Sequence, residues 1–226
     1  MESKMTAKII SVTNGKGGTG KTTVAYPLAC GLVSKGHNVL FVDLDPQRSS
    51  LKWTAKAQEE DVLNVPRAVG IEKPRFMDDI LSLRGSFDYI VIDSPGSLSD
   101  ELLPAQLLKI SDLVFIPIQP SPMDVDDSAT ILRMTESALI QRDDLKAFVL
   151  ITRDKEKTIL SKTIGNALED YNIPMFPVRI FDGELHKQLR GSGRTTFDPI
   201  QGLSKGEKRL VDNMNDFLNK ALEVLQ

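Results

Sequence analysis

A ten-residue glycine-rich segment, NGKGGTGKTT from Asn14 to Thr23, constrains this chain more than any other feature of its sequence. It contains the phosphate-cradle pattern G-x-x-x-x-G-K-[ST] as Gly15, Gly20, Lys21 and Thr22. The pattern is meaningful only where a buried strand precedes it and a helix follows it. The chain is therefore expected to place a strand, this loop and a helix in immediate succession.

The flanking residues supply that context. Residues 7–13 (AKIISVT) are mostly apolar and partly β-branched, which predicts a buried strand. Residues 21–35 predict a helix that ends at Gly36. Pro27 lies inside this predicted helix, so we expect it to kink the helix or to move its start.

The loop has the chemistry of a phosphate site. Its glycines let backbone amides approach a phosphate closely, and the following helix N-terminus adds partial positive charge. We expect Lys21 to reach the β- and γ-phosphates of a nucleotide and the Thr22 hydroxyl to bind Mg²⁺, with Thr23 close by. The remaining expected nucleotide contacts are Gly15, Lys16, Gly17, Gly18, Thr19 and Gly20.

Two further apolar runs end in aspartate. Residues 38–43 lead to Asp43 and Asp45, and residues 87–93 lead to Asp93. Ligands of an open parallel sheet bind outside the carboxyl ends of its strands. A single strand-end aspartate is equally explained as a helix cap, but three of them together with the phosphate loop indicate one site for Mg²⁺ and a nucleotide.

Strand-like and helical stretches alternate along the rest of the chain. Apolar runs recur near residues 113–118, 146–152 and 175–180, with helical stretches between them. This alternation predicts an α/β fold, a mostly parallel twisted sheet with helices on both faces. Residues 63–69 are a further strand candidate that Pro66 weakens. The 226 residues fit one domain, 1–226.

Composition excludes several kinds of protein. The single cysteine, Cys30, cannot form an internal disulfide and is expected to be a small buried residue. The two histidines, His37 and His186, are far apart, and no cluster of metal ligands is visible. The N-terminal residues are polar, and no apolar run approaches the length of a membrane span. We therefore expect a cytoplasmic protein.

The last predicted helix, residues 204–225, carries an apolar stripe that suits packing onto the sheet. A basic amphipathic helix that binds membranes is the alternative. Residues 207–226 hold 3 basic and 4 acidic side chains, so they lack the cationic face of such an anchor. We expect no membrane partner.

The motifs resemble those of the deviant Walker A ATPases of the ParA/MinD group, and most closely the small ParA-type plasmid and chromosome partition ATPases. The loop holds a second lysine, Lys16, at the place of the signature lysine of that group. VDLDPQ resembles the second acidic motif and VIDSPG the Walker B motif of these ATPases. IPIQPSP (116–122) and FVLITR (148–153) resemble two further segments, so the resemblance covers nearly the whole chain.

The resemblance implies roles for several residues. Lys16 would reach across a homodimer, formed in the ATP state, to the phosphates bound by the partner subunit. Lys21 would act at the phosphates, and Asp45 would position or activate the attacking water. Asp43 and Asp93 would hold Mg²⁺ through its water shell, and the loops that follow them would sense the γ-phosphate.

The resemblance also implies an adenine site and a DNA surface. Arg153 and Pro177 would flank the adenine, although a salt bridge would explain Arg153 equally well. Residues 151–209 hold 11 Lys and Arg against 8 Asp and Glu, while the whole chain has a net charge of −3. Candidate contacts to DNA phosphates, for which solvated surface charge is the alternative, are Lys155, Lys157, Lys162, Lys187, Arg190, Arg194, Lys205, Lys208 and Arg209, with Arg190, Arg194, Lys205 and Lys208 favoured.

The implied function is a slow, Mg-dependent ATPase that binds DNA non-specifically as a dimer, associates with the nucleoid and segregates plasmid or chromosome DNA. A centromere-binding, ParB-like adaptor would stimulate hydrolysis. The alternative cargo is a protein assembly positioned on the nucleoid or a membrane. A metabolic ATP-dependent ligase or amidase would not need Lys16, and a non-hydrolysing module would not need the full set of site residues. The first expected strand begins at residue 7, which leaves no room for the helix-turn-helix domain with which larger partition ATPases repress an operon.

Overall fold

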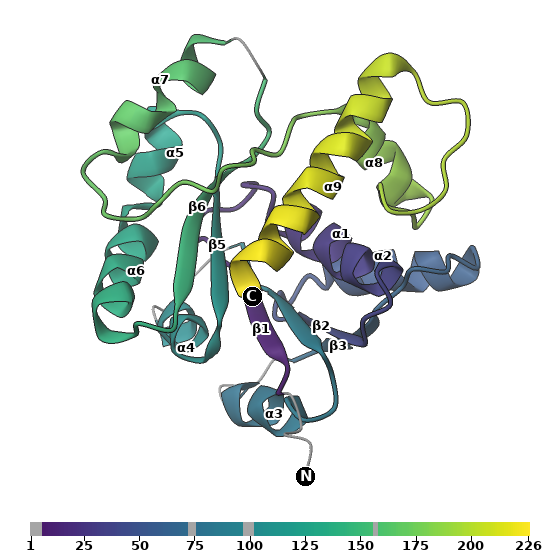
Figure 1. The fold of residues 1–226 in the computed structure, drawn as a ribbon, viewed down its shortest axis with the longest axis horizontal. Coiled ribbons are helices and arrows are strands. Elements are labelled where there is room, and N and C mark those ends of the chain that lie inside the picture. The colour runs from purple at the N-terminus through teal and green to yellow at the C-terminus, as the bar shows by residue number, and fades with distance from the viewer. Residues whose placement is uncertain (1–5, 72–75, 97–101, 156–157) are drawn as a thin grey trace.

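Strands and helices alternate along residues 6–71, 76–96, 102–155 and 158–226, the part of the chain that the computed structural model describes (Figure 1). The strands are β1 (Lys8–Val12), β2 (Val39–Asp43), β3 (Arg67–Gly70), β4 (Tyr89–Asp93), β5 (Leu113–Ile118) and β6 (Lys146–Ile151). The helices are α1 (Lys21–Ser34), α2 (Ser49–Glu59), α3 (Phe76–Leu83), α4 (Leu102–Ile110), α5 (Pro122–Asp127), α6 (Ala129–Gln141), α7 (Ile159–Leu168), α8 (Glu184–Gly191) and α9 (Lys205–Leu225).

The strands form one parallel sheet in the order β3-β2-β4-β1-β5-β6. The register places Asp43 of β2 beside Asp93 of β4, and Asp93 beside Val12 of β1. The ends of these three strands therefore form one row at the carboxyl edge of the sheet. The α/β fold predicted from the sequence, a parallel sheet with helices on both faces, is confirmed.

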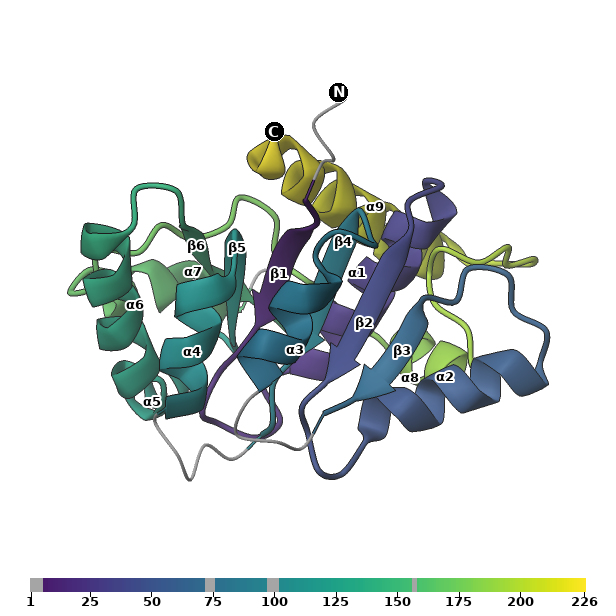
Figure 2. The same ribbon diagram turned by 90° about the horizontal axis from the view of Figure 1, so that it is seen from below.

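Side chains alternate between the two faces of the sheet, as expected for buried parallel strands. On β1, Ile10 and Val12 join a cluster formed with α1 and α9, while Ile9 faces a cluster formed with α3 and α4. A third cluster packs β5 and β6 against α5, α6 and α7. Figure 2 shows α3 and α4 on the face opposite α9. Helices thus cover both faces of the sheet.

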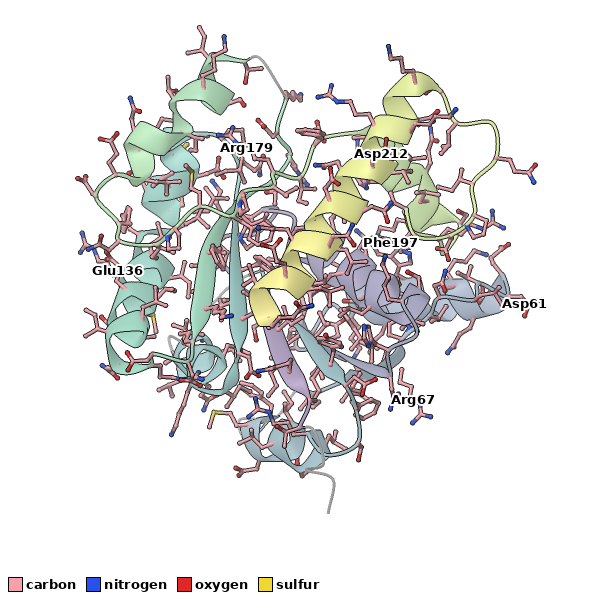
Figure 3. The ribbon with its side chains drawn as sticks, viewed as in Figure 1. Asp61, Arg67, Glu136, Arg179, Phe197 and Asp212 are labelled. Carbon is pink, nitrogen blue, oxygen red and sulfur yellow. The ribbon has the colours of Figure 1, made fainter. Side chains whose placement is uncertain are left out.

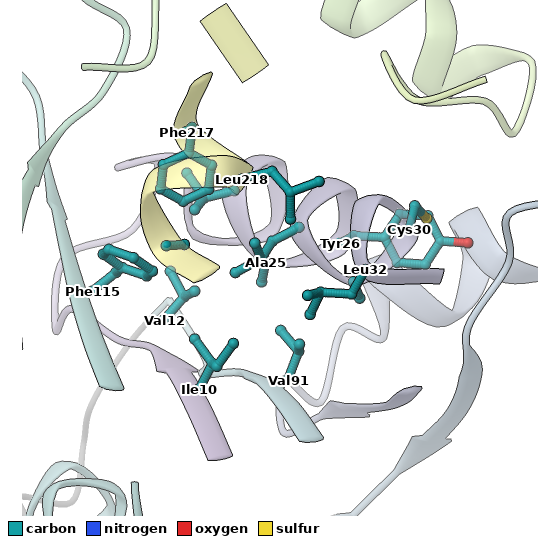
Figure 4. Close-up of a cluster of buried hydrophobic side chains, with 14 of the residues drawn as sticks. Ile10, Val12, Ala25, Tyr26, Cys30, Leu32, Val91, Phe115, Phe217 and Leu218 are labelled. Atoms are coloured by element: carbon teal, nitrogen blue, oxygen red, sulfur yellow. The ribbon is translucent and has the colours of Figure 1, made fainter. Parts of the chain in front are cut away.

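Helix α9 closes the core on the α1 face (Figure 4). Its side chains Phe217 and Leu218 are fully buried, and the Phe217 ring lies 5.2 Å from that of Phe115 between centroids. Gly31 of α1 gives this layer room, because a Cβ there would lie 2.9 Å from both Phe197 and Leu218. The prediction that the last helix packs onto the body of the protein is confirmed, and so is the burial of Cys30.

The strand predicted at residues 175–180 is wrong, and so is the shifted start that Pro27 was expected to give the helix after the loop. Residues 175–180 do not form a regular strand: Met175 makes an isolated bridge to Val149 of β6, and Phe181, just beyond them, makes another to Asp154. Pro174 and Pro177 have no N–H to donate, which interrupts the ladder. Helix α1 begins at Lys21 and continues through Pro27 to Ser34, because its burial against the sheet outweighs the loss of one intrahelical hydrogen bond. The weak strand candidate at 63–69 is present in part, as β3 after Pro66.

We predict that Phe217→Ala lowers the free energy of unfolding by about 3–5 kcal/mol, because it removes a fully buried aromatic ring and leaves a cavity. Urea denaturation followed by circular dichroism measures this change. The control is Ile140→Ala, since Ile140 is 84% exposed and its loss should cost well under 1 kcal/mol. Equal effects of the two substitutions would contradict this account of the core.

Candidate functional site

The phosphate loop connects β1 to α1 and has the backbone conformation that its glycines allow. Gly18 and Gly20 adopt φ angles of 78° and 94°, in the region that other residues avoid. The Lys21 Nζ donates to the backbone oxygen of Lys16 at 2.7 Å, so the lysine folds back over the loop. Lys21 is only 6% exposed, and burial lowers the pKa of its ammonium group. A phosphate in the loop would supply the counter-charge that this buried cation needs.

Neighbouring elements hold the loop in place. Asn14 Nδ2 donates to the Pro117 oxygen and to Ser128 Oγ, both at 2.9 Å. On the other side, the Thr152 hydroxyl donates to the Thr19 oxygen at 2.7 Å. The sequence analysis did not identify Asn14 or Ser128 as part of the site. Both are ordinary polar residues whose role appears only when β1 and β5 are paired.

The aspartates at the ends of β2 and β4 form a buried pair bridged by one hydroxyl. Ser50 Oγ lies 2.9 Å from Asp43 Oδ2 and 3.1 Å from Asp93 Oδ2. The Thr22 hydroxyl donates to the same oxygen of Asp93 at 2.7 Å. The pKa of Asp93 is raised to about 7, mainly by burial and also by the nearby Asp43, while the hydrogen bonds from Thr22 and Ser50 oppose the shift.

Asp43 also serves as a helix cap. Its Oδ2 accepts from the backbone N–H of Ser50 at 3.1 Å and of Leu51 at 3.4 Å, in the first turn of α2. Its Oδ1 accepts from the N–H of Asp45 at 2.9 Å. The two explanations of a strand-end aspartate therefore both apply to Asp43: it caps α2 and it lies beside Asp93. Asp45 is partly exposed, and its carboxylate accepts from the Gln47 N–H at 2.8 Å.

These residues fit a Mg²⁺ ion. Asp93 Oδ1 is buried and has no hydrogen-bond partner, so its negative charge is only partly compensated. Thr22 adds a hydroxyl oxygen beside it. Among the described residues there is no group of three or more His, Cys, Asp or Glu that could hold a metal by itself. This suits Mg²⁺, which is usually bound through one or two carboxylates together with phosphates and water.

The second lysine of the loop, Lys16, is held within its own chain. Its Nζ lies 2.8 Å from Asp124 Oδ1 and 2.7 Å from Asp127 Oδ2, both on α5. Hydrogen bonds to these two carboxylates raise the pKa of Lys16, so it stays charged. The sequence analysis missed Asp124 and Asp127, because only the fold brings α5 next to the loop.

A cavity of about 370 Å³ adjoins the C-terminal end of the loop. Gly20, Thr23 and Thr152 lie on its wall, and so does Arg153, which has a positive φ of 50°. Pro177 does not reach it: this residue lines a separate hollow with Asp154 and Arg179. That Pro177 flanks the base stays a prediction, while Ile180, three residues further on, does line the cavity beside the loop. The wall facing the loop is made by Ile180, Phe181, Asp182, Gly183, His186, Lys187 and Arg190, with Trp53 from α2.

The favoured basic residues lie on the surface around α8 and the start of α9. Arg190, Arg194, Lys205 and Lys208 are all exposed. Others have partners nearby: Lys155 lies 3.8 Å from Asp182, Lys187 lies 3.0 Å from Glu184, and Arg209 stacks on Phe181 at 4.9 Å. Lys162 is exposed on α7. Lys157 and part of the loop after Asp93, residues 97–101, lie outside the described residues.

Comparison with known proteins gives several relatives. A family model described as an AAA domain matches residues 7–73. The chain is 26% identical over 213 residues to the maintenance of carboxysome distribution protein A of Halothiobacillus neapolitanus, which covers 94% of this chain and 95% of that protein. It is 24% identical over 232 residues to the chromosome partitioning protein ParA of Caulobacter vibrioides, covering 84% of each.

The fold of this chain is also found in solved structures of other proteins. A variant of McdA from Cyanothece in complex with ATP superposes with a TM-score of 0.71 at 20% identity, covering 97% of this chain and 98% of that one. In the described part of the chain, every helix is too short or too polar to cross a bilayer.

The raised pKa of Asp93 predicts a pH dependence of stability in metal-free protein. Because its pKa is about 3.8 unfolded and about 7 folded, the folded state binds more protons between these values, and stability falls as pH rises through that window. In Asp93→Asn the decrease in the free energy of unfolding over this pH range should be smaller by about 2–4 kcal/mol. Thermal unfolding in EDTA from pH 4 to about 8 measures it, with exposed Asp79→Asn as the control. Parallel pH profiles for wild type and Asp93→Asn would contradict the buried, protonated carboxyl.

Proposed function

We propose that this chain is a P-loop ATPase of the ParA/MinD type and that it acts as an ATP-gated DNA tether that positions a cargo in the cell. Its cofactors are ATP and Mg²⁺. The observation that carries the proposal is the second loop lysine, Lys16, whose ammonium group is paired with Asp124 and Asp127 of α5 while Lys21 folds back over the loop. An ordinary phosphate loop needs only Lys21. A second cation at this place suits an ATPase whose site is completed by another subunit.

In this proposal the residues of the site have different roles in phosphoryl transfer. Backbone amides of the loop from Gly15 to Thr23 cradle the phosphates, and Lys21 contacts the terminal ones. Thr22, Asp43 and Asp93 hold Mg²⁺, which neutralises charge on the phosphate oxygens when bound. Asp45 positions or activates the attacking water, since it follows β2 and is more exposed than Asp43 at the end of that strand. Arg153 lies beside the base.

Lys16 acts in trans in this proposal. In the single chain, Asp124 and Asp127 neutralise it at the rim of the site. When two chains face each other across their nucleotides, Lys16 leaves these carboxylates and approaches the phosphates held by the partner. Positive charge there stabilises the charge that develops during transfer. Breaking the two ion pairs gives a reason for slow turnover by the chain alone.

The basic surface at the start of α9 supports binding to DNA phosphates. Lys205 and Lys208 lie in the first turn of this helix, beside the Ser204 capping box. Cations at a helix N-terminus oppose the helix dipole and do not stabilise the helix. Their exposure and position are therefore better explained by contact with an anionic partner. Binding through phosphates alone would be independent of base sequence.

Two cargoes fit the same ATPase. One is plasmid or chromosome DNA, joined through a centromere-binding adaptor of the ParB kind that stimulates hydrolysis. The other is a protein assembly, and the relative named for carboxysome distribution supports it, since the match covers 94% of this chain. In this proposal the protein works in the cytoplasm, on the nucleoid for a DNA cargo and on the nucleoid or a membrane for a protein cargo. The identity of the adaptor encoded beside it distinguishes the two.

We predict that Lys16→Gln lowers adaptor-stimulated ATP turnover by at least about 100-fold, as expected for loss of a cation at the transition state. Nucleotide binding should remain, because Lys21 is intact. Exposed Lys8→Gln is the control. Mixing Lys16→Gln with Asp45→Ala chains should restore activity in one of the two sites of a mixed dimer. No restoration by mixing, or normal turnover in Lys16→Gln, would rule out action in trans.

Random-sequence duplex DNA should bind at least about tenfold more tightly with Mg²⁺ and a non-hydrolysable ATP analogue than with Mg²⁺ and ADP. Fluorescence anisotropy at fixed moderate salt measures this difference. Lys208→Gln should reduce the slope of log affinity against log salt by about one. The control is Lys220→Gln, near the other end of α9. Absence of binding in both nucleotide states would point to a protein or membrane surface as the track.

A further inference from the structure

Helix α2 touches both ends of the candidate nucleotide site. Its first turn carries Ser50, which is fully buried between the two aspartates. One turn later it carries Trp53, which is 4% exposed and lies on the wall of the cavity beside the loop. The helix therefore spans from the expected metal position to the expected base position. Nothing in the sequence assigned it a role.

At the metal end, Ser50 joins α2 to both carboxylates. Its N–H and its hydroxyl both lie within hydrogen-bond distance of Asp43 Oδ2, at 3.1 Å and 2.9 Å, and its hydroxyl lies 3.1 Å from Asp93 Oδ2. A serine hydroxyl has one proton to donate, so it can satisfy only one of the two carboxylates at a time. The hydrogen bond of Ser50, and with it the first turn of α2, therefore depends on what the aspartates hold.

At its other end, α2 packs against residues 190–198, which we call the basic segment. The Arg190 guanidinium carbon lies 5.5 Å from the centroid of the Trp53 ring. Gly193, with a φ of 72°, lies directly on the backbone of α2, because a Cβ there would be 2.6 Å from the N and Cα of Ala57. These two contacts pack the basic segment directly against α2. Figure 1 shows α8 beside α2.

The chain just after α2 makes a third connection. Asn64 Nδ2 donates to the Phe197 oxygen at 3.2 Å and to Asp198 Oδ1 at 3.3 Å. Asp198 in turn accepts from the N–H and hydroxyl of Thr195, which fixes the turn. The ring of Phe197, within this turn, lies against Gly31 of α1 (Figure 3). The basic segment is thus fastened at several points, while Arg190 and Arg194 remain exposed.

We infer that α2 couples the metal end of the nucleotide site to the basic segment, and that Ser50 is the positioning residue at which this coupling begins. The inference rests on the proposed function, since the basic segment carries two of the candidate DNA contacts. A helix packed on a close-packed interior moves as a unit, so a change at its first turn reaches Trp53, Ala57 and the residues that they touch. Binding of Mg²⁺ and nucleotide would in this way reposition Arg190 and Arg194.

Trp53 is the only tryptophan in the chain, so its fluorescence reports on the contact with Arg190. The full chain is titrated with the ATP analogue AMPPNP, once with Mg²⁺ and once in EDTA, without DNA. Hydrogen exchange of residues 190–198 is measured in parallel, because the base itself could alter the emission of Trp53. We expect both signals to change with Mg²⁺ and AMPPNP, and much less with AMPPNP in EDTA.

Ser50→Ala should raise the Mg²⁺ concentration for half of this change by about tenfold, the effect expected for one lost hydrogen bond to a charged group. Affinity for AMPPNP in EDTA should stay within about threefold of wild type, since the loop is untouched. If Ser50 had only a structural role, its loss would change the Mg²⁺ midpoint and the affinity for AMPPNP in EDTA together. Ser49→Ala is the matched control, because it removes the same hydroxyl one residue away at a partly exposed position.

Asn64→Ala tests the coupling from its other end and does not depend on the folding of Ser50→Ala. It should keep the response of Trp53 but abolish at least half of the exchange response of residues 190–198. The inference is overturned if Ser50→Ala and Asn64→Ala both give the fluorescence and exchange changes of the wild type. It is also overturned if the wild-type protein shows neither change while calorimetry shows that AMPPNP is bound with Mg²⁺. Because no DNA is present, a failure of nucleotide-gated DNA binding leaves this result unaffected.

Discussion

The pairing of β2 with β4 sets two carboxylates side by side in the interior, and much of the site depends on this arrangement. Asp43 and Asp93 are neighbours in the register and are almost fully buried. Two buried like charges are unfavourable without a counter-charge. Hydrogen bonds from Thr22, from Ser50 and from the first turn of α2 compensate them in part. The negative charge that these hydrogen bonds leave uncompensated is what a divalent cation would neutralise at this edge of the sheet.

The same row of strand ends links the loop to its surroundings. β1 leads into the phosphate loop, and its neighbour β5 leads into α5, whose carboxylates hold Lys16. Asn14 ties the loop to β5 and to the start of α6. The catalytic loop, the metal carboxylates and the mobile cation of the proposal are therefore not separate motifs. They are consecutive positions along one edge of a parallel sheet.

Much of this was predictable because it follows from local pattern. Five strands and the helix after the loop lie where apolar runs and glycine place them, and the stripe of α9 predicts its buried face. Residues 175–180 were mispredicted because their apolar pattern hides the effect of two prolines on a ladder. Ser50, Asp124 and Trp53 could not be found, since serine, aspartate and tryptophan near a loop have many ordinary roles. Only contacts between distant segments distinguish them.

The sequence by itself determined the chemistry of the loop and the class of fold. Both are local: glycine spacing sets which backbone torsions are open, and the alternation of strands with helices favours a parallel sheet. The tertiary structure alone decided which groups meet. Strand order brings Asp43 beside Asp93, places α5 under Lys16 and lays the basic segment on α2. Those contacts join residues that are at least 50 positions apart in the chain. The physical reason is that burial of apolar faces, and not sequence proximity, selects neighbours in a packed core.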